Sequence, residues 1–273
     1  MKIIDRIKHG ISVGGYMIKL NFKGQMEYPS FLIGWFLANA MQFAVGVGTL
    51  WVIATQFGGI NGWGFEEMAF MYGLGILAHA LSVIIYIQTW YLGEIIIGGD
   101  LDRMLLRPMN VYFQFCVMDF NLVGITDLLP GIIVFVYGAT AVGFSWSALN
   151  VIFIMCIVAG ATMIRGGIYT IVGATSFWTK KSRGLIDVIN DLLGRSIMYP
   201  MTIYNWAVQG IFTFILPLGF LAFYPAADFL GQDTGFAIPG PIPIWTLLIG
   251  IVMMSLGKAL FNRGLKRYDS AGN

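Results

Sequence analysis

Long apolar stretches separated by short polar connections dominate the chain. A helix needs about 20 mostly apolar residues to cross the hydrocarbon core of a bilayer, and six stretches of the sequence reach this length. The first contains the small residues Ala40, Ala44 and Gly48, whose spacing of four would let another helix approach closely. We predict transmembrane helices over residues 30–55, 68–90, 121–143, 148–177, 201–222 and 242–260.

Lysine and arginine occur in alternate connections between these spans. They lie before the first span, between the second and third, between the fourth and fifth, and after the sixth. The connections 56–67, 144–147 and 223–241 contain neither residue. Because positively charged connections stay in the cytoplasm, both termini are expected to be cytoplasmic. The sequence thus predicts an all-α, multi-pass integral membrane protein whose single transmembrane domain covers residues 1–273.

Two segments outside the spans are open to more than one interpretation. Over residues 1–25, apolar positions recur with a helical period and basic positions lie elsewhere on the wheel. This pattern predicts a helix in the cytoplasmic membrane interface, with its cations toward lipid headgroups; a partly disordered basic tail is the alternative. Residues 226–230 precede the last span and form either a re-entrant helix at the outer membrane surface or part of a plain loop.

Two further segments lie in connections that contain basic residues. After Gly98-Gly99, Asp100 is expected to cap a short helix that Pro108 ends, because the residue before proline avoids the helical region. The segment 185–199 is predicted to form an amphipathic helix, with apolar and polar positions on opposite faces, that ends at Pro200. The first of these helices has the apolar residues Leu101, Met104 and Leu105 and the polar residues Asp102, Arg103 and Arg107.

Composition agrees with a membrane location. Hydrophobic residues make up 58% of the chain and charged residues 11%, and the mean hydropathy is +0.77. Soluble proteins contain about 25% charged residues, so the outer surface of this chain must face lipid. The net charge of +2 is too small to indicate a nucleic-acid partner. Cys116 and Cys156 have no neighbours at metal-ligand spacing, and we expect neither a metal nor a cofactor.

Motifs for nucleotide binding and catalysis are missing from the sequence. Gly257-Lys258 is followed by Ala259 and lies inside the last span, so it is not part of a Walker motif. The sequence also contains no His-Glu-x-x-His and no Gly-x-Ser-x-Gly. We therefore expect no catalytic residue and no enzymatic activity in this chain.

Three polar residues inside the predicted spans are candidates for a structural or functional role: His79, Asp127 and Arg165. Ionisable groups are costly at membrane depth and tend to have partners there. Asp127 and Arg165 lie in consecutive spans, and we expect them to form an inward-facing ion pair; a role in a transport path and the lack of any contact are the alternatives. His79 is expected to form a hydrogen bond with a neighbouring helix, and a functional role is its alternative.

Several short motifs are familiar from a known family. They are residues 99–110 (Gly-Asp-Leu-Asp-Arg-Met-Leu-Leu-Arg-Pro-Met-Asn) with Gln114, Tyr199-Pro200 with Ile203-Tyr204, and residues 214–220, 224–226 and 264–272. Over essentially its whole length the chain resembles the permease subunits of ABC-2-type exporters, particularly a bacterial branch with six-span subunits. The first motif is the most specific one.

The resemblance implies a function and a set of partners. The chain would be the membrane-spanning permease of an ATP-driven ABC exporter in the bacterial cytoplasmic membrane. It would pair with a second permease, identical or a sister, above separate ATP-binding cassette ATPase subunits. The family contacts its ATPase through cytoplasmic coupling helices, here residues 100–107 and the loop with Lys180, Lys181 and Arg183. The family's usual re-entrant helices favour that interpretation of residues 226–230.

Two other functions are weighed against this one. A secondary transporter driven by ions would need inverted repeats or broken helices with carboxylates near the membrane midplane. An intramembrane enzyme would need a metal site or a nucleophile with its base. The sequence offers neither pattern, so an exporter permease is the leading hypothesis. The substrate, whether drug, lipid, peptide or glycan, does not follow from the sequence.

Overall fold

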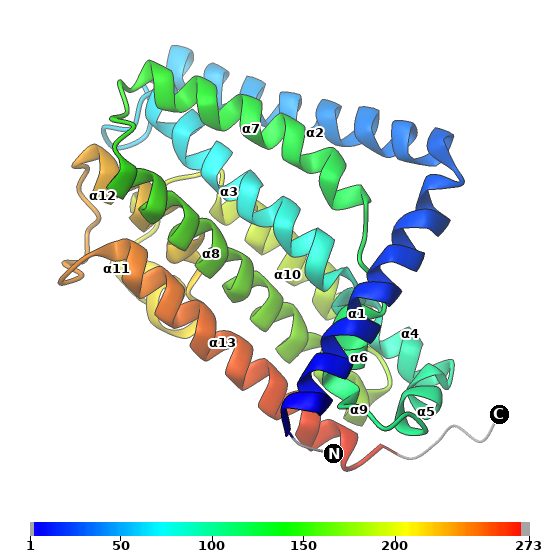
Figure 1. Ribbon diagram of the computed structural model, residues 1–273. Coiled ribbons are helices and arrows are strands. Elements are labelled where there is room, and N and C mark those ends of the chain that lie inside the picture. The colour runs from blue at the N-terminus through cyan, green and yellow to red at the C-terminus, as the bar shows by residue number, and fades with distance from the viewer. Residues whose placement is uncertain (1–2, 269–273) are drawn as a thin grey trace.

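The computed structural model describes residues 3–268, with side chains from residue 12 onward. The first eleven residues of the predicted interfacial helix therefore lie outside the described side chains, and the motif 264–272 is described only as far as residue 268. In the described part the chain is helical and contains no strand (Figure 1). The longer helices are α1 (Ile3–Met26), α2 (Pro29–Phe57), α3 (Phe65–Tyr86), α7 (Val123–Ala141), α8 (Ala148–Ala174), α10 (Arg183–Ser196) and α13 (Ile242–Leu265). The short α-helices are α4 (Leu92–Ile97), α5 (Asp100–Leu105), α6 (Val111–Val117), α9 (Ser176–Thr179), α11 (Trp206–Gly210) and α12 (Phe223–Leu230).

Five helices in the described part of the chain are long and apolar enough to cross a membrane. They are α2, α3 continued through the 3-10 helix Ile87–Tyr91 and α4, α7, α8 with α9, and α13. Each lies where the sequence predicts a span. Together they form an all-α integral membrane bundle, and α1 extends from one end of it (Figure 1).

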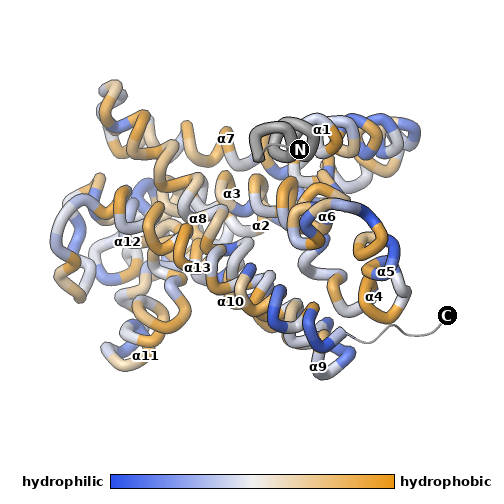
Figure 2. Tube along the Cα trace, turned by 60° about the horizontal axis from the view of Figure 1, so that its bottom comes forward, coloured by the Kyte–Doolittle hydropathy of each residue, from blue (hydrophilic) through white to orange (hydrophobic). Residues whose placement is uncertain are grey.

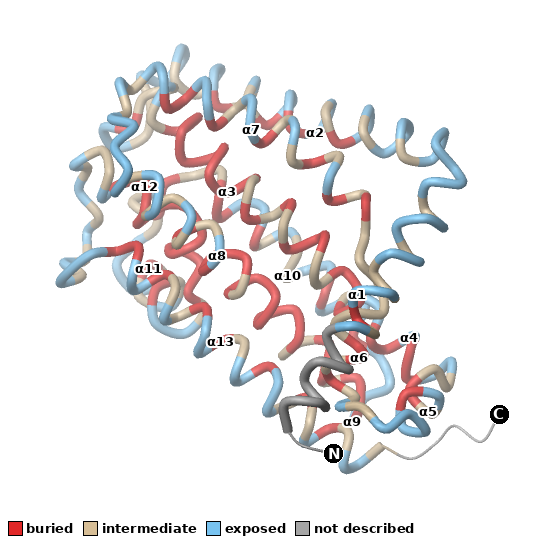
Figure 3. The backbone as a smooth tube through the Cα atoms, in the orientation of Figure 1, coloured by how far each residue is buried: buried red, intermediate tan, exposed pale blue. Residues whose placement is uncertain are grey.

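The centre of the bundle consists of two closely packed helix pairs. α3 packs on α7, and a Cβ on Gly124 of α7 would approach the carbonyl oxygen of Ala80 to 2.6 Å. α8 packs on α13, and a Cβ on Gly160 of α8 would lie 2.6 Å from the carbonyl carbon of Thr246. Real Cβ atoms do not come this close, so only glycine permits these backbones to touch, as in other membrane helix pairs. α3 and α8 accordingly contain more buried residues than any other helix (Figure 3).

α2 lies on the surface of this bundle and is mostly exposed (Figure 3). The residues that it buries are Asn39, Phe43, Gly46 and Leu50. The small residues predicted to receive another helix fall on a different side, and Ala44 and Gly48 are exposed. That face of α2 is therefore open in a single chain.

One end of the bundle, which we call the loop-helix end, contains α4, α5, α6 and α9 (Figure 1). These short helices share a hydrophobic core of their own with the last turns of α8 and α13, which includes Leu101, Phe115, Phe177 and Phe261. Hydrophilic positions gather around α1, α5 and α9, whereas α7, α8 and α13 are mostly hydrophobic (Figure 2). The connections 58–64, 142–147 and 231–241 lie at the other end, which we call the far end.

The predicted span 201–222 is not one helix. It consists of a 3-10 turn, α11, a π-helical turn over Ile211–Ile215 and a second 3-10 turn. The side chain of Asn205 caps α11 by accepting hydrogen bonds from the N–H groups of Ala207 and Val208. Pro217, which has no N–H, separates the last two pieces. The expectation of a continuous helix is therefore wrong, because apolar composition conceals a helix start and a proline break.

α10 takes the chain from the loop-helix end to the middle of the bundle, where Ile197, just after it, lies against Gly75 of α3 (Figure 1). Its carbonyl oxygen at Leu193 accepts a hydrogen bond of 3.3 Å from Arg165, in the middle of α8. Just beyond α10, the carbonyl oxygen of Thr202 accepts a hydrogen bond of 2.8 Å from Asn61 in a far-end connection. The segment from α10 to Thr202 thus traverses the bundle alongside α8.

The position of α10 corrects a second expectation. The sequence predicts an amphipathic helix over residues 185–199, and the structure has one, but it lies along the bundle rather than in a connection. Hydropathy misses it because the charged residues on one face lower the average over the whole segment. The short helix expected within 226–230 is present as α12, whose residues Phe223, Tyr224 and Ala226 are fully buried at the far end.

Candidate functional site

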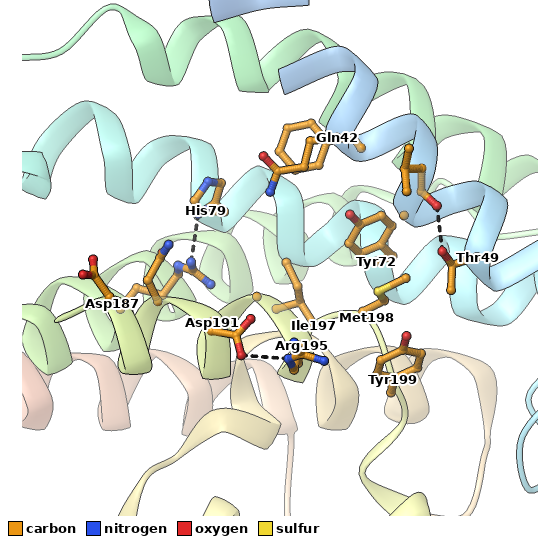
Figure 4. A pocket seen from close by; sticks show the side chains of 16 residues that line it. Gln42, Thr49, Tyr72, His79, Asp187, Asp191, Arg195, Ile197, Met198 and Tyr199 are labelled. Atoms are coloured by element: carbon orange, nitrogen blue, oxygen red, sulfur yellow. Dashed lines mark hydrogen bonds and ion pairs between the residues drawn. The ribbon is translucent and has the colours of Figure 1, made fainter. Parts of the chain in front are cut away.

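A polar cavity of about 490 Å³ opens between α2, α3, α8 and α10 (Figure 4). Gln42 and Thr49 line it from α2, Tyr72 and His79 from α3, and Arg165 from α8. α10 and the residues after it contribute the longest wall, which comprises Asp187, Asn190, Asp191, Gly194, Arg195, Ile197, Met198 and Tyr199. A polar cavity of this size inside an otherwise apolar bundle is the first candidate for a functional site.

Arg165 lies at the inner wall of the cavity and is 1% exposed. Its position, nine residues before the end of α8, is about 13 Å from that end at ~1.5 Å per residue. The guanidinium donates to Ser82 Oγ and to the carbonyl oxygen of Leu193, both at 3.3 Å, and its Nη2 lies 2.8 Å from His79 Nδ1. α8 thus holds both α3 and α10 through one side chain.

His79 separates the two charges that the sequence predicts to be paired. Its Nε2 lies 3.6 Å from Asp127 Oδ2, and its Nδ1 faces Arg165. The side chain of Asn39 donates a hydrogen bond to the other oxygen of Asp127. No direct ion pair between Asp127 and Arg165 occurs in the described structure, so the expected pairing is replaced by a chain through His79. The imidazole fits because its two nitrogens can face an acid and a cation at once.

This network of polar side chains connects four helices of the bundle. Asn39 belongs to α2, Asp127 to α7, His79 to α3 and Arg165 to α8. A second bond, from the Tyr169 hydroxyl to Asn190 Oδ1 at 2.8 Å, ties α8 to α10 again. The expected hydrogen bond between His79 and a neighbouring helix is therefore present.

The charged face of α10 is open to the cavity. Asp187, Asp191 and Arg195 are exposed and recur every four residues, on one side of the helix. At ~1.5 Å per residue they lie roughly 6, 12 and 18 Å beyond the start of the helix. Asp191 forms an ion pair with Arg195 at 2.8 Å, and Asp187 forms one with Arg183 at 3.4 Å. The sequence offered the signal for these residues in that spacing of four.

The short helix α5 differs in detail from its prediction. Gly99, with φ +75°, caps it, and Asp100 is its first residue. Leu101 is 0% and Met104 7% exposed, because they pack into the core of the loop-helix end. Two of the three apolar residues of this helix are thus used within the chain, and Leu105 is not.

Outside that core, α5 presents a small exposed surface. Leu105 and Leu106 are 49% and 87% exposed. Arg103 forms an exposed ion pair with Asp100 at 3.6 Å, and Arg107 is exposed. Arg103, Leu105, Leu106 and Arg107 thus form an exposed surface at the end of this helix, which we call the knob after α5. Asp102 interacts within the chain and is not counted in this knob.

The motif 99–110 with Gln114 has a structural explanation. The buried Gln114 side chain donates to the carbonyl oxygens of Met104 and Met109, at 2.9 and 3.1 Å. These bonds fix the end of α5 and the turn after it. Asn110 caps α6 by accepting from the N–H of Phe113 at 3.0 Å. The motif thus encodes a short helix held in one orientation.

The second predicted contact region also lies at the loop-helix end, beside α4 (Figure 1). Lys180 and Lys181 are exposed in the turn between α9 and α10. Arg183 lies 3.9 Å from Glu94 of α4 and covers the ring of Tyr91 at 5.1 Å. The two predicted contact regions are therefore on the same end of the molecule.

Comparison with known families assigns the chain to a protein family. The sequence profile described as ABC-2 family transporter protein matches residues 39–272. The chain belongs to this family. ABC-2 proteins are membrane components of ABC transporters, so the chain is a multi-pass permease component of such a transporter. No curated protein matches the chain significantly.

Membership of the ABC-2 family gives the two sites a common context. A transporter component that associates with ATP-binding cassette subunits needs a path for substrate and a contact surface for those subunits. The polar cavity and the knob after α5 are the candidates, and they lie in different parts of the molecule. Only the second was predicted from a motif.

Proposed function

We propose that this chain is the permease of an ABC exporter and that the polar cavity is part of its translocation path. The observation that carries the proposal is the charged, exposed face of α10. Asp187, Asp191 and Arg195 lie within the length of the bundle, where exposure to lipid would be very costly. A water-filled path or a second subunit must therefore cover them, and an exporter supplies both.

Energy would reach this path from separate ATP-binding cassette subunits through the knob after α5. The knob is short, is fixed by Gln114 and exposes Leu105 and Leu106, so it can transmit a push as a rigid body. Lys180 and Lys181 would add a second contact at the same end. ATP hydrolysis takes place in the partner, because no residue pattern in this chain is suited to bind the phosphates of ATP.

A second permease, identical or a sister, would complete the path. The exposed face of α2 that contains Ala44 and Gly48 supports this pairing, since small residues allow close helix contact. It adjoins the cavity, whose wall includes Gln42 and Thr49 of the same helix. The complex would sit in the bacterial cytoplasmic membrane with lipid around it and both termini in the cytoplasm.

The rival functions are less well supported. The broken segment 206–222 is the kind of helix that secondary transporters use for ions, but it contains no aspartate or glutamate. An intramembrane enzyme would need a catalytic or metal-binding cluster. In the described residues no group of three His, Cys, Asp or Glu side chains gathers to hold a metal.

The decisive experiment is co-purification of the tagged chain with its ATPase after replacement of Leu106. Leu106→Asp should reduce recovery of the ATPase strongly, because a lost apolar anchor can cost about 2 kcal/mol or more. Leu106→Met keeps an apolar tip and should retain the parent's recovery. Both variants should reach the membrane, since Leu106 is outside the core. If Leu106→Asp assembles and transports like the parent, the coupling role of this knob is wrong.

A further inference from the structure

We infer that Arg165 binds an anionic group of the transported molecule, so that the cavity selects amphipathic substrates with a phosphate or carboxylate. The inference rests on the proposed role of the cavity as a transport path. It concerns what the path recognises, which neither the family nor the motifs determine.

The first step is the charge balance of the cavity wall. Asp187 and Asp191 each have an arginine four residues away on α10, in Arg183 and Arg195. Arg165 has no such partner: among the described residues no carboxylate forms an ion pair with it. Of the two arginines that line the cavity, Arg165 is therefore the one that forms no ion pair with a carboxylate of the described residues.

The second step concerns the groups that now contact Arg165. Ser82 and the Leu193 carbonyl are neutral acceptors at 3.3 Å, His79 Nδ1 lies 2.8 Å away, and the Tyr169 hydroxyl is a further neutral partner. Asp127 reaches the guanidinium only through the imidazole and does not line the cavity. A guanidinium has five N–H donors and binds an anion more strongly than a neutral acceptor, so a phosphate or carboxylate that enters the cavity would be a better partner for Arg165, which lines it.

The third step is the shape of the surrounding wall. Phe43, Tyr72, Ile197, Met198 and Tyr199 provide apolar and aromatic surface next to the polar floor. Figure 4 places Tyr72, Met198 and Tyr199 together on one side and His79 on the other. An amphipathic molecule with an apolar body and an anionic head matches both parts. A small free anion would use only the floor.

The test uses the complete complex in phosphatidylcholine nanodiscs and three photoreactive probes with the same dodecyl chain. The probes end in a phosphate, a trimethylammonium or a hydroxyl group. Crosslinked peptides from α2 and α10 are quantified relative to peptides from the lipid-facing side of α13, which corrects for partition into the bilayer. The phosphate probe should label the cavity about tenfold more than the ammonium probe, as a charge-assisted contact predicts.

Variants assign this preference to Arg165. Arg165→Gln should reduce phosphate labelling to the ammonium level, while Ser82→Ala, which removes a long neutral contact, should keep it. Excess inorganic phosphate should not displace the probe; if it does while labelling still depends on Arg165, the site binds the free anion and the amphiphile specificity is wrong. Equal labelling by phosphate and ammonium in the parent complex overturns the inference, even if Arg165→Gln does not fold. That result would leave ATP-driven transport possible, because the proposed function is tested separately by co-purification of the Leu106 variants with the ATPase.

Discussion

At the residue scale, His79 decides how the buried charges are arranged. Asp127 and Arg165 are each too costly to leave alone at membrane depth. Direct pairing would join only two helices, whereas the imidazole between them lets α3, α7 and α8 share one network. Asn39 extends this network to α2.

Replacement of His79 by leucine should destabilise the protein. The change leaves Arg165 without its close partner and Asp127 with only Asn39, and an unsatisfied buried polar group costs about 1–3 kcal/mol. We expect a lower melting temperature of the purified protein in detergent, measured by loss of the monodisperse chromatographic peak.

Two controls accompany this change. His79→Gln keeps a donor and an acceptor and should recover part of the loss. Thr140→Val removes a hydroxyl that bonds only to its own helix, at Val136 and Tyr137, and should have little effect. A melting temperature of His79→Leu equal to that of the parent would show that the polar chain adds nothing to stability.

The residue scale is also where the sequence predicted least. It identified His79, Asp127 and Arg165 because charged residues stand out in apolar spans. It could not order them, since the order depends on how α3 rotates between α7 and α8. That rotation is set by contacts such as Gly124 against Ala80, which no pattern in one sequence reveals.

At the element scale, α10 is the principal departure from the sequence prediction. Hydropathy averages over all faces of a helix, so a segment with charges at 187, 191 and 195 does not qualify as a span. Residues 201–222 qualify by composition, although Asn205 and Pro217 divide them. The five uniformly apolar helices were placed well because every face of each is apolar or packed.

Thiol labelling should show that one face of α10 meets water. In a background with Cys116→Ser and Cys156→Ser, Gly194→Cys should react with a hydrophilic maleimide. Ile251→Cys, on the exposed side of α13 at a similar depth, should react on the order of tenfold more slowly, because only a hydrated thiol ionises and attacks. Equal, slow reaction at both positions would mean that the charged face of α10 is covered, and the translocation path would have to lie elsewhere.

At the scale of the whole molecule, two kinds of contact divide the bundle. Backbone contacts at Gly124 and Gly160 unite α3 with α7 and α8 with α13. The walls of the cavity, α2 and α10, pack through apolar side chains such as Phe43 and Leu193. They are also held by polar bonds, from Asn39 on one side and from Arg165 and Tyr169 on the other. Polar bonds can be exchanged for bonds to water or substrate, whereas glycine contacts cannot. The walls are therefore the parts of the molecule best suited to move.

The position of α10 determines how the chain must cross the membrane. If α10 is the fifth crossing, the residues just after it lie at the far end, where Thr202 accepts a hydrogen bond from Asn61. If residues 201–222 were the fifth span, as hydropathy indicates, those residues would begin it at the loop-helix end. The two arrangements place Ile203 on opposite sides of the membrane.

Labelling of intact cells with a membrane-impermeant maleimide distinguishes them. Ile203→Cys is exposed and should react together with Asp233→Cys, a far-end position that both arrangements place outside. Lys180→Cys should react only after permeabilisation, because the basic loops stay in the cytoplasm. Reaction of Ile203→Cys only with Lys180→Cys would restore residues 201–222 as the span and remove α10 from the path. Reaction of Lys180→Cys in intact cells would instead reverse the whole orientation, and with it the side on which an ATPase could reach the knob after α5.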